Sequence, residues 1–138
     1  MALTAADAEA LLRDKFAPWV QALGLTVDAI EGGSVVLRMK FGAHVTRVGG
    51  IVCGQSLMAL ADTATVLAIS SALGEFRDMA TVDQTTSFMR PIANADVIAK
   101  ARVLKLGRSL VFGEVAIYPD GSDKLAANVT TTYALAPG

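Results

Sequence analysis

The chain has 138 residues, of which 53% are hydrophobic and 18% charged, and its 12 basic and 13 acidic residues give a formal net charge of −1. This length fits one hydrophobic core, so we expect residues 1–138 to form a single domain. The balanced charge, without a dense basic tract, argues against nucleic-acid binding. The first residues lack the basic region and apolar run of a secretory signal, and we expect a cytoplasmic protein.

Cysteine and histidine are scarce. The only cysteine, Cys53, excludes an internal disulfide and a cysteine-cluster metal site, and the only histidine is His44. A lone cysteine is more often a small buried hydrophobe than a nucleophile, and a loop histidine is more often a surface residue than a catalyst. We therefore expect no metal site and no Ser–His chemistry.

The first predicted element is a helix over 4–23, where apolar residues recur at the spacing of one helix face. Thr4 is a plausible N-cap. Asp7 stands three residues on, where a capping box usually has Glu or Gln. Pro18 predicts an interruption or kink.

A β-hairpin follows, with strands over 25–30 and 34–41 and a glycine-containing turn between them. The richest apolar stretch, 51–73, would be apolar on nearly all sides of a helix, which is typical of a helix buried in the core. Gly74 predicts its end. Polar residues, Asp62 among them, interrupt this stretch, so we do not expect a membrane span.

Four further strands are predicted over 81–89, 97–106, 110–118 and 125–135. Turn-forming residues fill each separator, so we expect consecutive strands to be antiparallel neighbours. The order of elements fits an α+β fold with one helix wrapped by a curved antiparallel sheet. A lone subunit of this kind would leave a long strand edge unpaired, which together with the apolar composition predicts a homodimer or homotetramer.

Asp62 stands out because a carboxylate in an apolar helix is costly unless it is paired, hydrogen-bonded or facing a cavity. The segment 49–54 places glycines before this helix, and the free N–H groups at a helix start can receive negative charge. Acyl transfer needs such donors and a carboxylate that attacks or activates water, so Gly54 and Asp62 could supply the two. A structural role is equally open for Asp62, which a neighbouring strand or dimer contact would satisfy, and Gly54 could simply begin the helix.

A set of short segments resembles the signature of PaaI-like hotdog thioesterases. Gly50-x-x-Cys53-Gly54-Gln55 is followed by Leu60-Ala61-Asp62-Thr63-Ala64, and then by motifs in the family's order and at similar spacing, Thr81-Val82-Asp83, Phe88-Met89-Arg90-Pro91 and Lys105-Leu106-Gly107-Arg108. The resemblance implies the hotdog fold and hydrolysis of an acyl-coenzyme A thioester to the free acid and coenzyme A, without a metal or redox cofactor.

The resemblance also implies catalytic roles. Asp62 matches the nucleophile or general base, and Gly54 matches the glycine whose amide polarises the thioester carbonyl. Thr81 matches a Ser or Thr that helps to place water, in a pocket built by the helix of one subunit and the strand of its mate, so Thr81 would act across the interface. Gln55 lies seven positions before Asp62 on the same helix stripe and is a further candidate in the site.

Arg90 and Arg108 are candidates for the phosphate or pantetheine end of coenzyme A, since guanidinium suits phosphate, although a solvated surface role is as common. Arg47, Cys53 and Gln55 stand where the family usually has Asn, His and Gly. We include Arg47 and Cys53 among the residues expected to contact substrate.

Two other functions compete with hydrolysis. The departures from the family signature fit an acyl-CoA-binding hotdog protein with weakened turnover. A hotdog hydratase would need an Asp–His pair, and His44 lies outside the matching motif. An acyl-CoA sensor that binds DNA would need an added basic helix-turn-helix, for which the chain has no room.

Overall fold

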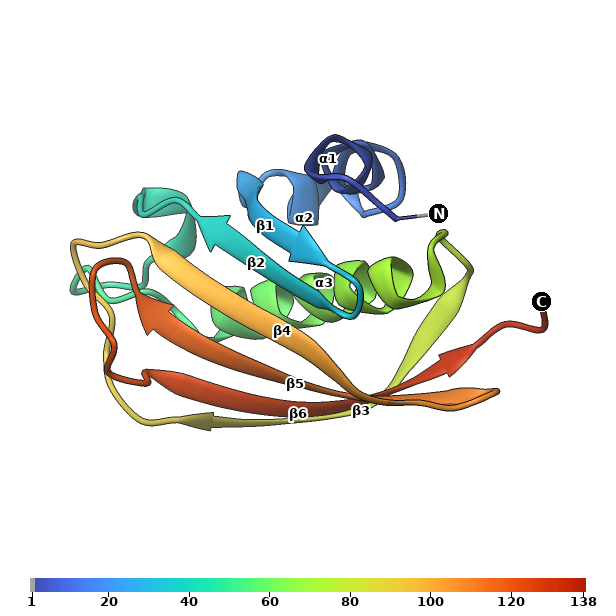
Figure 1. Ribbon diagram of the computed structural model, residues 1–138. Helices are drawn as coiled ribbons and strands as arrows, with labels where there is room; N and C mark the ends of the chain where they lie inside the picture. Colours follow the sequence, from blue (N-terminus) through green and yellow to red (C-terminus); the bar gives the residue numbers. More distant parts are fainter. Residues whose placement is uncertain (1) are drawn as a thin grey trace.

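The computed structural model describes residues 2–138, in which six antiparallel strands curve around one long helix (Figure 1). The elements are α1 (Ala5–Asp14), α2 (Pro18–Gln21), β1 (Leu25–Glu31), β2 (Ser34–Met39), a 3-10 turn (Ala43–Val45), α3 (Gly54–Leu73), β3 (Met79–Phe88), β4 (Val97–Leu106), β5 (Leu110–Pro119) and β6 (Ala127–Leu135). This is the α+β hotdog architecture that the sequence predicts.

The N-terminal helix begins with a complete capping box. The Asp7 N–H donates to the Thr4 hydroxyl (3.1 Å) and the Thr4 N–H donates to the Asp7 carboxylate (2.8 Å), which lowers the pKa of Asp7. Pro18 interrupts the predicted helix completely, because it begins a separate one-turn helix, α2. Glu9 accepts a hydrogen bond from the Val27 N–H (2.9 Å) and ties α1 to β1.

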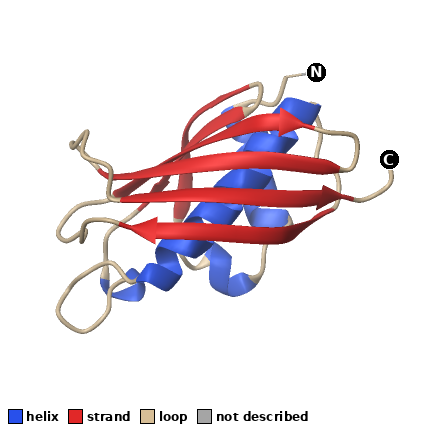
Figure 2. Ribbon diagram, turned by 90° about the horizontal axis from the view of Figure 1, so that it is seen from below, coloured by secondary structure: helices blue, strands red, loops and turns tan. Residues whose placement is uncertain are grey.

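The strand order in the sheet is β1-β2-β4-β5-β6-β3. The expected antiparallel pairs β1–β2, β4–β5 and β5–β6 are confirmed. The prediction that the strands now identified as β3 and β4 are neighbours is wrong: β3 pairs with β6, and residues 89–96 carry the chain past one end of the sheet, back to β4 beside β2 (Figure 2). The turn-forming residues in 91–96 predicted a connection between the two strands but not that it crosses to the other side of the sheet. The topology leaves β3 as an edge strand.

Helix α3 is the centre of the core. Leu60, Leu67 and Ile69 are fully buried, and most of the helix lies inside the protein. Its length and hydrophobicity therefore reflect a core helix rather than a membrane span. Its buried hydroxyls are satisfied locally; that of Thr65, for example, donates to the carbonyl four residues earlier (2.9 Å). Gly113 in β5 lets the helix approach, since a Cβ there would lie 3.4 Å from the Thr65 methyl.

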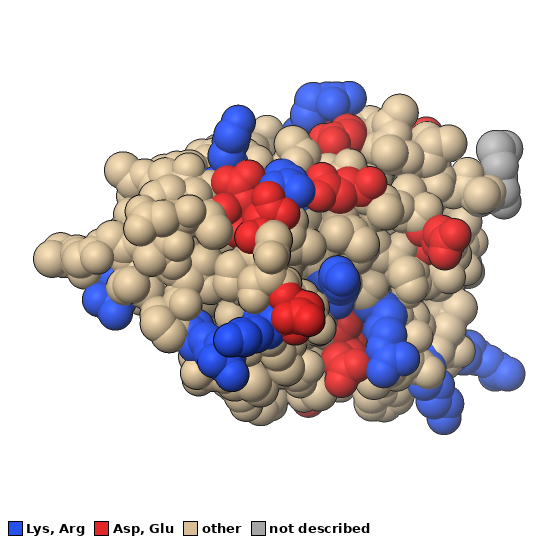
Figure 3. Space-filling view, turned by 60° about the vertical axis from the view of Figure 1, so that its left-hand side comes forward, with Lys and Arg blue, Asp and Glu red and all other residues tan. Residues whose placement is uncertain are grey.

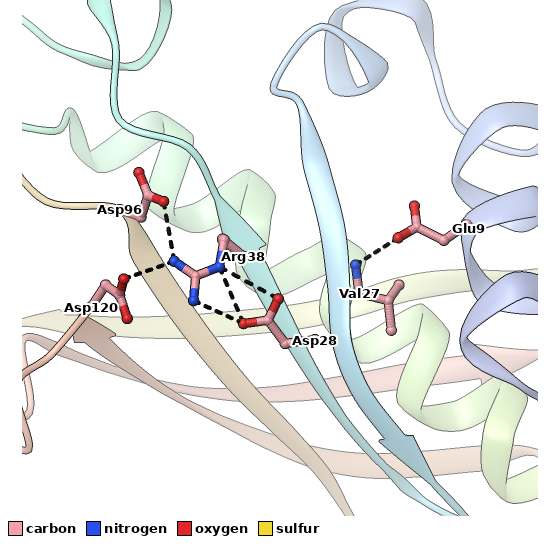
Figure 4. A network of polar contacts seen from close by, with 6 residues as sticks. All are labelled: Glu9, Val27, Asp28, Arg38, Asp96 and Asp120. Carbon is pink, nitrogen blue, oxygen red and sulfur yellow. Dashed lines mark hydrogen bonds and ion pairs between the residues drawn. The ribbon is translucent and has the colours of Figure 1, made fainter.

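The opposite face of the sheet carries an ionic network. Arg38 in β2 pairs with Asp28 (3.1 Å), Asp96 (3.1 Å) and Asp120 (2.8 Å), and so links four segments of the chain (Figure 4). The pKa of Asp96 is lowered, chiefly by the hydrogen bond from the Phe41 N–H. On the face in Figure 3, acidic and basic side chains are interspersed without a basic tract. Because the network joins β1 and β2 to the segments at Asp96 and Asp120, we assign it to the stability of the sheet.

Candidate functional site

Asp62 lies half-buried in the middle of α3 and faces β3 and β6. Its Oδ1 accepts a hydrogen bond from the Thr81 hydroxyl (3.0 Å) and a short one from the Tyr133 hydroxyl. The Tyr133 hydroxyl also lies 3.0 Å from the main-chain carbonyl oxygen of Asp62. The carboxylate that stood out in the sequence is thus held by two hydroxyls from neighbouring strands.

The β3–β6 register explains this arrangement. Thr81 and Tyr133 are direct partners across the two strands, so their side chains leave the sheet on the same face, toward α3. Tyr133 is only 2% exposed, and burial, followed by the charge of nearby Asp62, raises the pKa of its phenol. Tyr133 therefore stays protonated and acts as a hydrogen-bond donor.

The role expected for Thr81 across a subunit interface stays a prediction. The structure places its hydroxyl against Asp62 of the same chain. The physical reason is the β3–β6 pairing, which lays β3 beside its own α3.

Gly54 is the first residue of α3, behind an extended N-cap residue, Cys53, that provides no side-chain cap. The N–H groups of such a first turn have no partner within the helix. The ring of Phe88 covers Gly54 closely, since a Cβ at Gly54 would lie 3.2 Å from the ring. A side chain at position 54 would therefore require a small shift of the Phe88 ring.

A groove of about 290 Å³ adjoins Gly54. Its walls are mainly apolar, with two arginines, and are formed by Arg47, Ile51, Val52, Gly54, Leu57, Phe88, Met89, Arg90, Pro91 and Ile92. The structure thus gathers three of the expected site residues, Gly54, Arg47 and Arg90, around one concave surface.

The groove does not include Asp62. Gly54 and Asp62 are eight residues apart on one helix, which corresponds to about 12 Å along its axis at about 1.5 Å per residue. Within one chain, the amide of Gly54 and the carboxylate of Asp62 are too far apart to act on the same carbonyl group.

The remaining candidates are not among the residues that line this groove. Gln55 is exposed, and Cys53 is half-buried with its N–H bonded to the Val45 carbonyl (2.9 Å). Arg108 lies in the β4–β5 turn, at the opposite end of the sheet from Gly54 (Figure 1). The His44 ring lies 3.3 Å from the Leu23 carbonyl, which occupies one of its nitrogens.

Two residues at this site escaped sequence reasoning. Tyr133 falls on the inner face of an alternating strand, where a tyrosine is usually part of the core, and only the unforeseen β3–β6 pairing brings it to Asp62. Phe88 was noticed only as part of a motif. Strict alternation along β3 would place Phe88 and Thr81 on opposite faces; the irregularity between Thr81 and Asp83 brings both to the face toward α3, so no sequence signal indicated this contact.

Comparisons with known proteins agree with this geometry. Residues 49–126, which include Gly54, Asp62 and Thr81, match the family model described as the thioesterase superfamily. A protein of Thermoplasma volcanium named as an esterase is 32% identical over 108 residues, covering 78% of this chain and 80% of that protein.

Solved structures agree as well. The structure of zebrafish thioesterase superfamily member 2 has a TM-score of 0.87 at 26% identity, covering 98% of this chain and 100% of that one. The Escherichia coli PaaI protein has a TM-score of 0.83 at 23% identity, covering 96% of this chain and 93% of that one, a likeness in fold. The predicted hotdog fold and the resemblance to the thioesterase superfamily are confirmed.

Proposed function

Because the chain belongs to the thioesterase superfamily, we propose that it hydrolyses an acyl-coenzyme A thioester to the free acid and coenzyme A. The observation that carries the proposal is the environment of Asp62. One carboxylate oxygen is held by two hydroxyls, and no hydrogen bond to the other oxygen comes from residues 2–138. A carboxylate held in this way keeps one oxygen available for chemistry.

In the proposed reaction, the Gly54 N–H and the start of α3 stabilise the negative charge that develops on the thioester oxygen. Asp62 either takes a proton from the water that attacks the carbonyl carbon, or attacks that carbon itself to give a mixed anhydride that water then hydrolyses. In both cases the C–S bond breaks, the electron pair leaves with sulfur, and the thiolate is protonated to coenzyme A.

We propose that two copies of the chain build each site, because one copy separates Gly54 from Asp62. Phe88 lies against Gly54 and Thr81 against Asp62, so α3 runs antiparallel alongside the edge strand β3. Two β3 edges paired antiparallel about a two-fold axis near the middle of the strand would place Thr81 of one copy opposite Phe88 of the other. That pairing moves Asp62 of one copy toward Gly54 of its mate.

The surface of β3 supports this dimer. Val82 and Phe88 are more than half exposed in the single chain, at 56% and 53%. An unpaired edge with exposed apolar side chains is a surface that proteins normally cover. The exposed Leu110 and Phe112 in β5 offer a second apolar surface for a dimer of dimers.

A negative charge near the proposed two-fold axis should weaken the dimer. We expect wild type to have a mass of at least twice 14.3 kDa, and Thr85→Asp to raise the dimer dissociation constant about ten-fold or more, since like charges meet across the axis. Thr130→Asp is the matched control. Thr130 is also exposed, but it lies on β6, where it pairs with Thr85, and β6 is not the edge strand of the sheet. Light scattering after size exclusion measures both; a monomeric wild type would contradict the shared site.

Arg47 and Arg90 at the groove rim are the proposed contacts for the phosphates of coenzyme A. Arg108 would have to serve a site other than the groove of its own chain. We propose that residues 1–138 form one domain and that the enzyme is cytoplasmic. Its single cysteine, Cys53, is unpaired.

Binding without turnover is the second candidate function. It is favoured by Cys53 and Gln55, which replace the His and Gly of the family signature, and by the Phe88 ring over Gly54. Free-thiol release from a panel of acyl-CoAs decides between the two. The hydrolase proposal predicts release that depends on Asp62, whereas calorimetric binding of coenzyme A esters without any thiol release would establish the binding protein.

A further inference from the structure

Tyr133 makes a contact that the proposed reaction does not yet use. Its hydroxyl and that of Thr81 converge on the same oxygen, Oδ1, of Asp62. A hydroxyl carries a single proton, and both neighbours of the Tyr133 hydroxyl at Asp62 are acceptors. The carboxylate is the stronger acceptor of the two, so the proton is directed mainly to Oδ1.

The ring that carries this hydroxyl is firmly held. Tyr133 packs in a small cluster with Val66 and Ile69 of α3, Val111 of β5 and Leu135 of its own strand. A buried aromatic ring in such a cluster has little freedom to rotate, so its hydroxyl is a fixed point. Burial and the adjacent carboxylate raise the pKa of the phenol, so this fixed point remains a donor through the neutral pH range.

We propose that Tyr133 is a positioning residue that, with Thr81, fixes Oδ1 of Asp62 and thereby presents Oδ2 as the oxygen that acts on water or the thioester. This inference rests on the proposed function, because it assumes that Asp62 reacts. An exposed aspartate rotates about both side-chain torsions, whereas two donors on one oxygen fix the plane of the carboxylate. Correct placement of a reacting group can carry much of its catalytic effect.

Tyr133→Phe removes only the hydroxyl and keeps the ring in its cluster. We expect kcat to fall about 10- to 100-fold, as for loss of one hydrogen bond to a charged group, while KM stays within about two-fold. Tyr118→Phe is the matched control, since Tyr118 is the other tyrosine and its ring lies beside Lys100 on the far face of the sheet. Replacing Tyr133 with 4-aminophenylalanine, which keeps a donor, should restore most of kcat.

A double-mutant cycle with Asp62→Asn separates positioning from a general effect on folding. If Tyr133 acts through the carboxylate, Tyr133→Phe causes no further loss once Asp62 is replaced. An equal loss in both backgrounds, or a 4-aminophenylalanine variant as slow as Tyr133→Phe, would overturn the inference. If Tyr133→Phe is fully active and Asp62→Asn is inactive, the role of Tyr133 is refuted and the proposed function stands. If Asp62→Asn is fully active, the proposed mechanism itself is refuted.

Discussion

Asp62→Asn is expected to lower kcat for acyl-CoA hydrolysis about 10²- to 10⁴-fold, the usual effect of removing a general base. The amide has nearly the shape of the carboxylate and can still accept the hydrogen bonds of Thr81 and Tyr133. The fold and the affinity for coenzyme A should therefore be unchanged. Thiol release under saturating substrate measures the effect, with calorimetry to check binding.

Asp28→Asn is the control for this prediction. Asp28 is also a hydrogen-bonded carboxylate, but it pairs with Arg38 on the face of the sheet opposite α3. We expect full turnover from this variant. Equal rates for wild type and Asp62→Asn would remove Asp62 from the mechanism.

Gly54→Pro is expected to lower kcat about 10²- to 10³-fold, the typical effect of losing one oxyanion donor. Proline removes the N–H but suits the first position of a helix, and the extended Cys53 that precedes it has the backbone conformation that proline requires. The added ring atoms would press on Phe88, which is exposed enough to move.

Ala5→Pro provides the matched control. Ala5 is the first residue of α1 and follows Thr4, whose backbone is extended. The variant therefore places a proline at the first position of a helix that does not line the groove. It should unfold at the same temperature as wild type and retain full activity. A Gly54→Pro variant that is folded and as active as wild type would show that this amide does not stabilise the transition state.

Local sequence signals predicted most of the elements correctly. Thr4 and Asp7 identified the start of α1, Gly74 the end of α3, and the all-round apolar pattern its burial. These signals depend on residues close together in the chain. The pairing of β3 with β6, by contrast, joins segments that are far apart in the chain. The turn residues in 91–96 indicate a change of direction but carry no information on which strand lies beside β3.

The same limit applies to the site. Asp62 could be identified from sequence because an acid in an apolar helix is anomalous by itself, and the family resemblance pointed to Gly54 and Thr81. Tyr133 could not, because its chemistry depends on a pairing between distant strands. The separation of Gly54 from Asp62 followed from helix geometry once α3 proved continuous from one to the other.

Subunit complementation tests the shared site most directly. When the inactive variants Asp62→Asn and Gly54→Pro are unfolded together and refolded as a mixture, each mixed dimer has one site with an intact Asp62 and an intact Gly54 from different copies. Random assembly makes half of the dimers mixed, so we predict recovery of about one quarter of wild-type activity. If both groups of a site came from one chain, the mixture would stay as inactive as its two components, and a site shared between subunits would be ruled out.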